Sequence, residues 1–412
     1  MTPLRVCIFT ETYFPVVGGG ETQAQLMAEG LNTHGHSAII LTRRSGKDLK
    51  KFEQVGPTPV YRLAPAGKGQ LTKWGLVLSC VPALIKLRKE YDIIFVSGFR
   101  IVGITAVLVS KLLHKKCILK ADSQGEMSGE FFYNGLRKFG LSPTFFPFKI
   151  FLNLRNYILK KADAFSAISD DIVAELVSNQ VASNKIHAIP NAVDTHRFFP
   201  ADREHKTLLR RKLGLSESAT IVIYTGRLVS YKGLPLLLEV WNELRRHYEH
   251  INLYLLGSGG LDIHNCEAEL RAYVKSNNLG GSVYFTGSVK NVPEYLQAAD
   301  IFAFPTENDA FPSSLIEAMA CALPVVTTPV GAIKTVIADR ENGILFQPGN
   351  FQKLYQALDE LISDPTLMSK IGHAARETAQ ANYSSDAVIN KYLSLFKNNA
   401  NASFNIVFTP EK

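Results

Sequence analysis

Two kinds of apolar pattern alternate along this chain. Short continuous runs rich in Val, Ile and Phe are separated by longer segments in which apolar residues recur every three or four positions. The runs are typical of buried strands and the spaced segments of amphipathic helices, and their alternation favours parallel sheets with helices on both faces. The predicted strands are residues 5–10, 38–42, 92–96, 117–120, 164–168 and 186–189, then 220–225, 251–256, 282–285, 300–304, 325–328 and 344–346.

These strands fall into two groups, which a segment between Pro190 and Pro200 separates. A chain of 412 residues is long enough for two domains. We therefore expect an α/β protein with two doubly wound domains, over residues 1–195 and 196–384. Sheets of this kind bind ligands beyond the carboxyl ends of their strands. Binding residues are thus expected in the segments that follow the strands.

Composition limits the class of protein. Apolar residues make up 46% of the chain and charged residues 20%, which is typical of a globular protein rather than a disordered one. The five cysteines are scattered and include no C-x-x-C pair, so neither a disulfide framework nor a zinc site is expected. The amino-terminal segment lacks the apolar core of a signal peptide, and Arg100 interrupts the longest apolar run. We expect a cytoplasmic protein without a membrane span.

Positive charge is concentrated in the first half. Residues 1–200 hold 25 Lys and Arg against 15 Asp and Glu, which leaves 20 against 22 for the remainder of a chain with 45 and 37. Residues 131–161 contain nine Phe and Tyr and no acidic residue, and their basic residues are Arg137, Lys138, Lys149, Arg155, Lys160 and Lys161. Such a segment fits an anionic membrane surface, or it covers a domain face with lysines reaching outward. Nucleic acid is not the expected partner, because no known binding motif accompanies the charge.

Two basic residues follow the predicted strand 220–225, within the sequence GRLVSYKG, and a helical pattern comes next. Arg227 and Lys232 therefore lie on a strand-to-helix turn, where free amide groups and the helix dipole favour an anion. A forked guanidinium and a mobile ammonium would add charge-assisted hydrogen bonds to a phosphate. The alternative is that both are surface residues flanking the start of a helix.

Three consecutive glycines, Gly18, Gly19 and Gly20, join the first predicted strand to a helix. Without side chains they let a ligand approach the backbone, although flexible loops use glycine as well. Their spacing fits neither the dinucleotide-binding fingerprint nor the P-loop, so neither of these sites is predicted.

Two acidic residues follow the predicted strand 300–304, in the sequence FAFPTENDAFPSSLIEAMACALPVV. Asp309 comes soon after the strand, and Glu317 lies on a helix that ends before Pro324. Taken alone, Glu317 also fits a capping box with Ser314, in which it would only close the first turn of that helix.

The acidic pair resembles the signature of family 4 retaining glycosyltransferases of the GT-B fold, which usually have Glu in both positions. The glycine triplet, the turn with Arg227 and Lys232, and the acidic pair also occur in that family's order. Further stretches that are similar to the family are residues 189–194 (IPNAVD), 256–259 (LGSG) and 283–287 (VYFTG). The resemblance implies two Rossmann-like domains facing across a cleft, with the acceptor on the first and the nucleotide-sugar on the second. It also implies a helix over residues 385–400 that crosses back to the first domain, followed by a tail over 401–412.

The resemblance further implies a role for each motif. Glu317 would hold the ribose hydroxyls, because a carboxylate accepts two hydrogen bonds from neighbouring hydroxyls. Asp309 would contact the donor sugar, and Arg227 and Lys232 would hold the diphosphate. The other expected donor contacts are the backbone of Ala310 and Phe311, the glycines Gly18, Gly19 and Gly20, and residues 283–289 for the base.

The chain departs from the family at two places. Asp309 is one methylene shorter than the usual Glu. The family often carries a His after the fourth strand of the first domain, whereas residues 119–126 read LKADSQGE here. Asp122, Ser123 or Glu126 would take its place, or Asp122 would only cap a helix or a turn.

These features predict a retaining glycosyltransferase, most simply a hexosyltransferase, that moves a sugar from a UDP- or GDP-sugar to a polysaccharide or lipid-linked acceptor. The resemblance implies no other cofactor and no metal, and the chain contains no Asp-X-Asp. The protein would be cytoplasmic and would dock on the inner face of the membrane through residues 131–161. The alternatives are a nucleotide-sugar epimerase of the same architecture, or a non-catalytic member that binds nucleotide or membrane.

Overall fold

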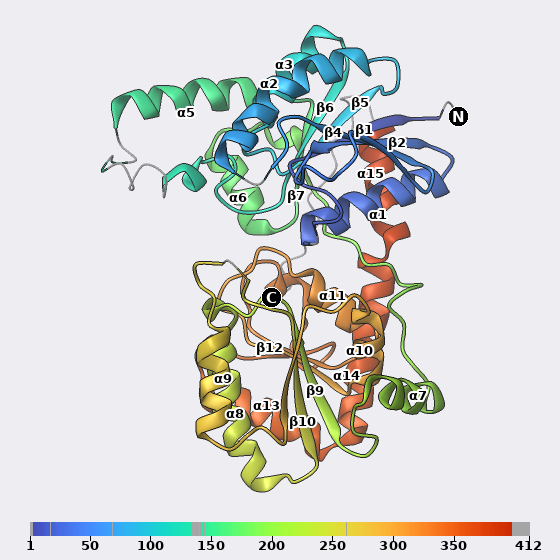
Figure 1. Cartoon of the computed structure of the whole chain (residues 1–412), viewed down its shortest axis with the longest axis vertical. Helices are drawn as coiled ribbons and strands as arrows, with labels where there is room; N and C mark the ends of the chain where they lie inside the picture. Colours follow the sequence, from blue (N-terminus) through green and yellow to red (C-terminus); the bar gives the residue numbers. More distant parts are fainter. Residues whose placement is uncertain are drawn as a thin grey trace. The chain divides into compact units, whose positions relative to one another are not determined.

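The computed structural model describes residues 3–16, 18–67, 69–133, 140, 142, 145–260 and 262–397. The chain forms two compact units (Figure 1). The first contains the residues up to Asn191 and those from Val388 onward, and the second is Ala192–Ala387. Each unit is a Rossmann-like α/β domain built on one sheet, which confirms the predicted fold class.

The first unit has a sheet in the order β3-β4-β2-β1-β5-β6-β7-β8, parallel except for the pair β3 and β4. Helices α2, α3 and α5 lie next to one another, and α1 and α15 lie apart from these three helices (Figure 1). The strands are Arg5–Thr10 (β1), Ser37–Arg43 (β2), Phe52–Val55 (β3), Thr58–Leu63 (β4), Ile93–Ser97 (β5), Lys116–Ala121 (β6), Ala164–Ala167 (β7) and Ile186–Ala188 (β8). The helices are Gly19–Thr33 (α1), Gln70–Lys86 (α2), Gly103–Leu112 (α3), Glu130–Phe132 (η1), Phe146–Leu159 (α5), Asp170–Ser178 (α6), Ser183–Lys185 (η2) and Ser385–Lys397 (α15).

The second unit has a parallel sheet in the order β11-β10-β9-β12-β13-β14. In Figure 1, α8 and α9 lie on one side of this sheet, and α10 and α11 lie on the other. The strands are Thr220–Thr225 (β9), Ile251–Leu256 (β10), Val283–Gly287 (β11), Ile301–Phe304 (β12), Val325–Thr327 (β13) and Ile344–Leu345 (β14). The helices are Arg203–Leu213 (α7), Ser230–Lys232 (η3), Leu234–His247 (α8), Glu267–Ser276 (α9), Val292–Ala298 (α10), Ser313–Ala320 (α11), Ile333–Val336 (α12), Phe351–Ser363 (α13), Pro365–Thr378 (α14) and Ala379–Tyr383 (η4).

The central strands are the most apolar segments of the chain. In β1, Val6, Cys7, Ile8 and Phe9 are fully buried, and β5 and β12 are buried along their whole length. A strand covered by helices on both faces has no polar side to show, so these runs stand out in the sequence. The pair β3 and β4 was missed because its short segments mix polar residues with a proline, and most of β3 is exposed.

Each sheet has one point at which the strand order reverses. In the first unit it lies between β1 and β5, and in the second between β9 and β12. At such a point the connections leave toward opposite faces, which opens a crevice at the carboxyl ends of the two strands. The topology therefore singles out the segments after β1, β5, β9 and β12 as binding elements.

Helix α15 packs onto the sheet of the first unit. The rings of Tyr392 and Phe396 lie 5.3 and 5.9 Å from that of Phe95 on β5. The Tyr392 hydroxyl also lies 3.0 Å from the Ser166 hydroxyl on β7. The last residues of the described chain thus complete the core of the unit that contains its first residues.

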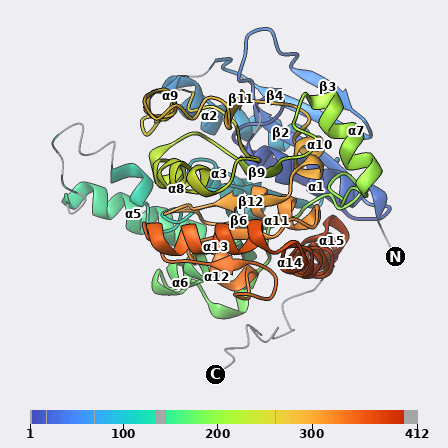
Figure 2. The same ribbon diagram turned by 90° about the horizontal axis from the view of Figure 1, so that it is seen from below.

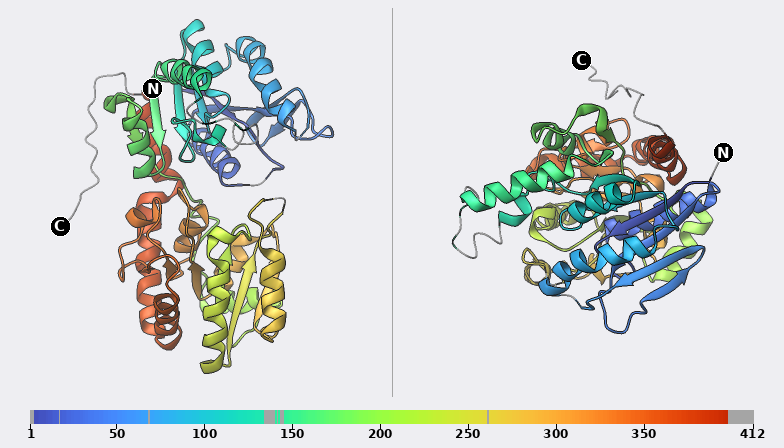
Figure 3. Two further views of the ribbon diagram at one scale, coloured as in Figure 1. Left: turned by 90° about the vertical axis from the view of Figure 1, so that its left-hand side faces the viewer. Right: turned by 90° about the horizontal axis from the view of Figure 1, so that it is seen from above.

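Helix α5 has an unusual place in the first unit. It projects from the body of that unit in Figures 2 and 3, and apart from Arg155 and Leu159 its side chains are at least partly exposed. Within the described residues, no helix has both the length and the apolar character needed to span a bilayer.

Candidate functional site

The strongest concentration of predicted site residues is at the carboxyl ends of β9 and β12. These strands are direct neighbours in the sheet, with Val222 and Ile223 opposite Ile301 and Phe302. The turn that bears Arg227 and Lys232 follows β9, and the loop that bears Asp309 follows β12. The fold therefore places both segments at the strand-order reversal of the second unit, where a ligand is expected.

Lys232 and Asp309 form an ion pair. Only 10% of the lysine side chain and 19% of the aspartate side chain are exposed. Lys232 Nζ also donates a hydrogen bond to the backbone oxygen of Asn308 at 3.3 Å. Because an ammonium group has three N–H donors, one of them has no hydrogen-bond partner among the residues that the structure describes. The pairing means that Asp309 holds Lys232 in place, a role that the sequence did not suggest.

Arg227 is more exposed, with 60% of its side chain open to solvent. Its guanidinium pairs with Asp262 and donates to the Tyr231 hydroxyl at 2.6 Å. The Tyr231 ring lies 5.9 Å from the Arg227 guanidinium and 5.4 Å from Lys232 Nζ. Tyr231 therefore lies between the two cations. Sequence reasoning missed both Tyr231 and Asp262, although Tyr231 directly precedes Lys232 in the chain.

Close backbone contacts fix the geometry of these loops. Gly233 has φ of 68°, and a Cβ atom there would lie 1.9 Å from the backbone oxygen of Pro305. A Cβ atom on Gly331 would lie 1.8 Å from the backbone oxygen of Asp309. Neither contact leaves room for a side chain. The loop after β12 therefore packs closely against the turn after β9 on one side and against Gly331 on the other. These backbone contacts thus hold together the two segments that carry Lys232 and Asp309.

Glu317 lies further along the chain, inside α11. That helix begins at Ser313, its N-cap is Pro312, and no side chain caps it. Glu317 therefore lies beyond the first turn, and the capping-box interpretation with Ser314 is wrong. No donor among the described residues hydrogen-bonds to its carboxylate. Burial raises the pKa of Glu317 to about 7, and only the charge of Arg197 opposes this shift.

The other predicted contacts of the second unit lie on adjoining strand ends. Phe311 is buried, with its ring 5.8 Å from that of Tyr383, which leaves mainly its backbone for a ligand. Gly257 and Gly287 close β10 and β11, and the Gly257 amide donates to the Gly287 oxygen at 2.9 Å. A Cβ atom on Gly257 would lie 1.8 Å from the backbone oxygen of Gly226. The segment predicted for the base is therefore linked by backbone contacts to the turn predicted for phosphate.

In the first unit, the glycine triplet forms the start of α1 rather than a loop. Gly18 is the extended N-cap residue, and Gly19 and Gly20 begin the helix. Apart from its chain neighbours and the backbone of its own helix, no described residue has an atom within 4 Å of the place where a Cβ on Gly20 would be. The amides of a first helical turn have no partners within the helix. This end of α1 could accept an anion, and its role remains a prediction.

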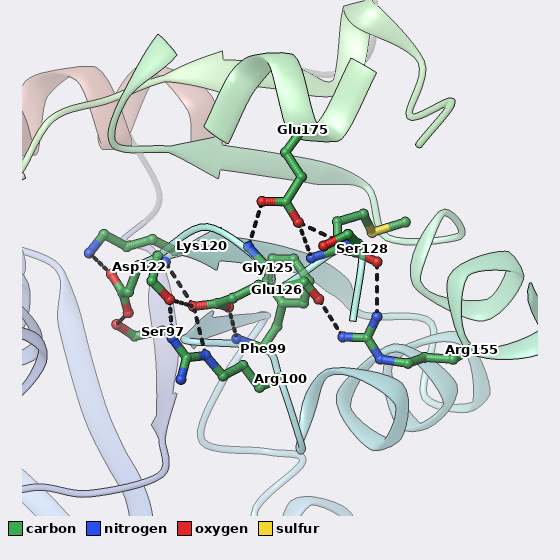
Figure 4. A network of polar contacts seen from close by, with 12 residues as sticks. Ser97, Phe99, Arg100, Lys120, Asp122, Gly125, Glu126, Ser128, Arg155 and Glu175 are labelled. Carbon is green, nitrogen blue, oxygen red and sulfur yellow. Dashed lines mark hydrogen bonds and ion pairs between the residues drawn. The ribbon is translucent and has the colours of Figure 1, made fainter. Parts of the chain in front are cut away.

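The segment in place of the family's histidine follows β6 (Figure 4). Asp122 is ion-paired with Lys120 and accepts a hydrogen bond from the Ser97 hydroxyl at 2.8 Å. Ser123 donates to the Glu126 carboxylate at 3.2 Å. Glu126 is buried, and desolvation together with the charge of Asp122 raises its pKa to about 7. Of the three candidates, Asp122 has the carboxylate that reaches solvent, with 25% of its side chain exposed.

In the basic aromatic segment, one side chain differs from the prediction. The sequence suggests a surface charge at Arg155, but the structure buries this side chain to 1% exposure. Its guanidinium donates to backbone oxygens instead, because a buried charge must be compensated by hydrogen bonds. Lys149 and Lys161 are exposed and Lys160 partly so. Arg137 and Lys138 lie outside the described residues.

No group of three or more His, Cys, Asp or Glu side chains suited to a metal ion occurs in the described part of the chain.

Both halves of the chain match known families. The model of group 1 glycosyl transferases matches residues 205–378, and that of glycosyltransferase family 4 matches residues 17–197. N-acetyl-alpha-D-glucosaminyl L-malate synthase of Bacillus anthracis is 23% identical over 93% of this chain and 95% of its own length.

Solved structures with the same fold cover nearly the whole chain. Sucrose-phosphate synthase of Thermosynechococcus elongatus has a TM-score of 0.78 at 20% identity, over 95% of this chain and 98% of that one. Anabaena Alr3699/HepE, solved with UDP and glucose, has a TM-score of 0.74 at 18% identity, over 96% of this chain and 100% of that one. At these identities the likeness establishes the GT-B fold alone.

Proposed function

The chain belongs to the group 1 glycosyltransferases of family 4, and we propose that it transfers a hexose from a nucleotide-sugar to a polysaccharide or lipid-linked acceptor. The transfer would retain the anomeric configuration and need no metal ion. A UDP-sugar is the first donor to test, because the Anabaena neighbour was solved with UDP and glucose.

The observation that carries this proposal is the cation cluster at the strand-order reversal of the second unit. Lys232 has one N–H free of its contacts with Asp309 and Asn308, and Arg227 is exposed beside it across Tyr231. These groups would hold a diphosphate. When the bond between the anomeric carbon and the diphosphate oxygen breaks, negative charge grows on the leaving group, and fixed cations stabilise this state more than the bound donor.

The carboxylates complete the proposed donor site. Glu317 has no hydrogen-bond donor among the described residues, so its oxygens are available for the two ribose hydroxyls. Asp309 would orient Lys232 and approach the sugar with its second oxygen. The base would lie along the backbone of residues 283–289.

A donor screen tests the proposal directly. A UDP-sugar should raise the melting temperature of the protein more than a GDP- or ADP-sugar does, because a ligand that binds only the native state stabilises it. Release of UDP, without conversion of the sugar to its epimer, should accompany slow donor hydrolysis in the absence of an acceptor. Accumulation of the epimer would identify an epimerase. Binding with no turnover in the presence of glycan and lipid-linked acceptors would identify a non-catalytic protein.

We also propose that α5 docks the first unit on an anionic lipid surface. Phe146, Ile150, Leu154 and Tyr157 are spaced along one face of the helix and are 73%, 52%, 58% and 60% exposed. Exposed Lys149 and Lys161 flank them, and the sequence around the helix contains no acidic residue. An apolar face with basic neighbours suits the boundary between lipid head groups and acyl chains. The lipid-linked class of acceptor would be reached there.

Reversing one charge on this helix and one just after it should weaken lipid binding. Each lysine near an anionic membrane contributes about 1 kcal/mol, so Lys149→Glu with Lys161→Glu should weaken binding at least roughly thirtyfold. Co-sedimentation with vesicles of phosphatidylglycerol and phosphatidylcholine measures this. The control is Lys275→Glu, at an exposed position on α9 of the second unit. Equal binding of the double variant and the wild type would refute docking through α5.

A further inference from the structure

The loop formed by residues 122–129, which follows β6, is held from two sides (Figure 4). On one side is Glu175 of α6. Its carboxylate accepts hydrogen bonds from the amides of Gly125, Met127 and Ser128 at 2.7, 2.9 and 2.8 Å. Three charge-assisted bonds from one side chain fix the amide side of the loop.

On the other side is Arg155 of α5. Its guanidinium donates to the backbone oxygens of Glu126 and Met127 at 2.5 and 3.2 Å. A planar fork can span two carbonyl groups in this way, whereas a single ammonium cannot do so with the same geometry. The carbonyl side of the loop is therefore attached to α5.

A second contact joins the loop to α5. Gly129 has φ of 78°, and a Cβ atom there would lie 2.5 Å from a methyl group of Leu152. Leu152 and Arg155 are three residues apart and therefore share one face of the helix. This face lies against the loop, whereas Phe146, Ile150 and Leu154 face solvent.

The loop is also hydrogen-bonded to residues that follow β5 and β6. The Glu126 carboxylate accepts from the amides of Phe99 and Asp122 at 2.8 and 3.2 Å. Asp122 is held in turn by Lys120 and Ser97. A chain of hydrogen bonds therefore joins Arg155 of α5 through Glu126 to Asp122.

We propose that Arg155 is a positioning residue, which couples contact between α5 and an anionic lipid surface to the order of the loop that presents Asp122. This rests on the proposed docking of α5. With α5 held at the lipid surface, the loop is more rigid, and the Asp122 carboxylate is preorganised to accept a hydrogen bond from an acceptor hydroxyl. Hydrogen exchange measures whether lipid contact at α5 reduces the mobility of this loop.

The test is hydrogen exchange of the peptide that contains residues 122–129, with and without phosphatidylglycerol/phosphatidylcholine vesicles. In the wild type, vesicles should slow exchange of this loop roughly tenfold. In Arg155→Lys, which keeps the charge but not the fork, the slowing should vanish while vesicle binding persists. The control is Arg62→Lys, because Arg62 is also buried in the first unit but pairs with Glu53 and the Phe14 oxygen. This control should retain the slowing.

Each outcome has a distinct meaning. Vesicle binding without slowing in the wild type would overturn the coupling and leave docking intact, whereas no binding would overturn both. Equal slowing in the wild type and Arg155→Lys would remove Arg155 from the link. If that variant fails to fold, Leu152→Ala can be used instead, because it removes the methyl groups that make the second contact. It should weaken the vesicle-induced slowing of exchange, and unchanged slowing would refute the proposal. UDP release from UDP-glucose without acceptor tests the second unit separately and should not change in the Arg155 variant.

Discussion

Replacing Lys232 by alanine is expected to lower kcat for sugar transfer by about 10²–10³-fold, the usual effect of removing one charge-stabilising donor from an active site. The ammonium would contact the diphosphate most strongly as its charge grows, so the loss should fall on kcat more than on donor affinity. Steady-state release of the nucleotide measures both. The control is Lys275→Ala, which removes an exposed lysine from α9 in the same unit and should have full activity.

The ion pair with Asp309 requires a second control, because Lys232→Ala leaves a partly buried carboxylate without its cation. Removing one partner of such a pair destabilises a protein independently of catalysis. The double variant Lys232→Ala with Asp309→Asn should recover melting temperature but not turnover. Recovery of turnover along with stability would mean that Lys232 acts only in folding.

Glu317→Gln is expected to weaken binding of the donor about tenfold at pH 8, without lowering the melting temperature of the unliganded protein. The amide keeps the shape of the carboxyl but replaces one of its two acceptor oxygens by a donor. One charged hydrogen bond contributes about 1.5–3 kcal/mol, and tenfold corresponds to about 1.4 kcal/mol. Isothermal titration with UDP and with the free base uracil separates this loss from base contacts. Equal affinities of the two proteins for UDP would remove Glu317 from the site.

The same variant should alter the pH dependence. Burial raises the pKa of Glu317 from 4.5 to about 7, so the folded protein keeps the proton that the unfolded chain loses near pH 4.5. The contribution of this group to the free energy of unfolding therefore falls as pH rises from about 4.5 to 7, and Gln abolishes the fall. Donor affinity should show the opposite trend, rising through pH 7 in the wild type as the carboxylate forms. A wild-type profile as flat as that of the variant would contradict this assignment.

The structure differs from a sequence-based interpretation at two residues whose local sequence fits two different environments. The S-x-x-E spacing of Ser314 and Glu317 is that of a capping box, but α11 begins at Ser313 and places Glu317 deeper in the helix. Arg155 looks like one more surface charge in a basic helix. Its burial follows from the loop carbonyls that happen to lie opposite it, and nothing in the local sequence records them.

The sequence by itself determined the two α/β units and their central strands. A strand buried on both faces must be apolar throughout, and β1, β9 and β10 were predicted with the bounds that the structure has. It also placed Arg227, Lys232 and Asp309 after strands, because the apolar runs of β9 and β12 that precede them are local features.

Only the tertiary structure decided which of these side chains meet. The pairing of Lys232 with Asp309 depends on β9 and β12 being neighbours, although 77 positions separate the two residues. Strand order is set by packing over the whole unit, so no short stretch of sequence encodes it. The attachment of the loop after β6 to α5 is of the same kind.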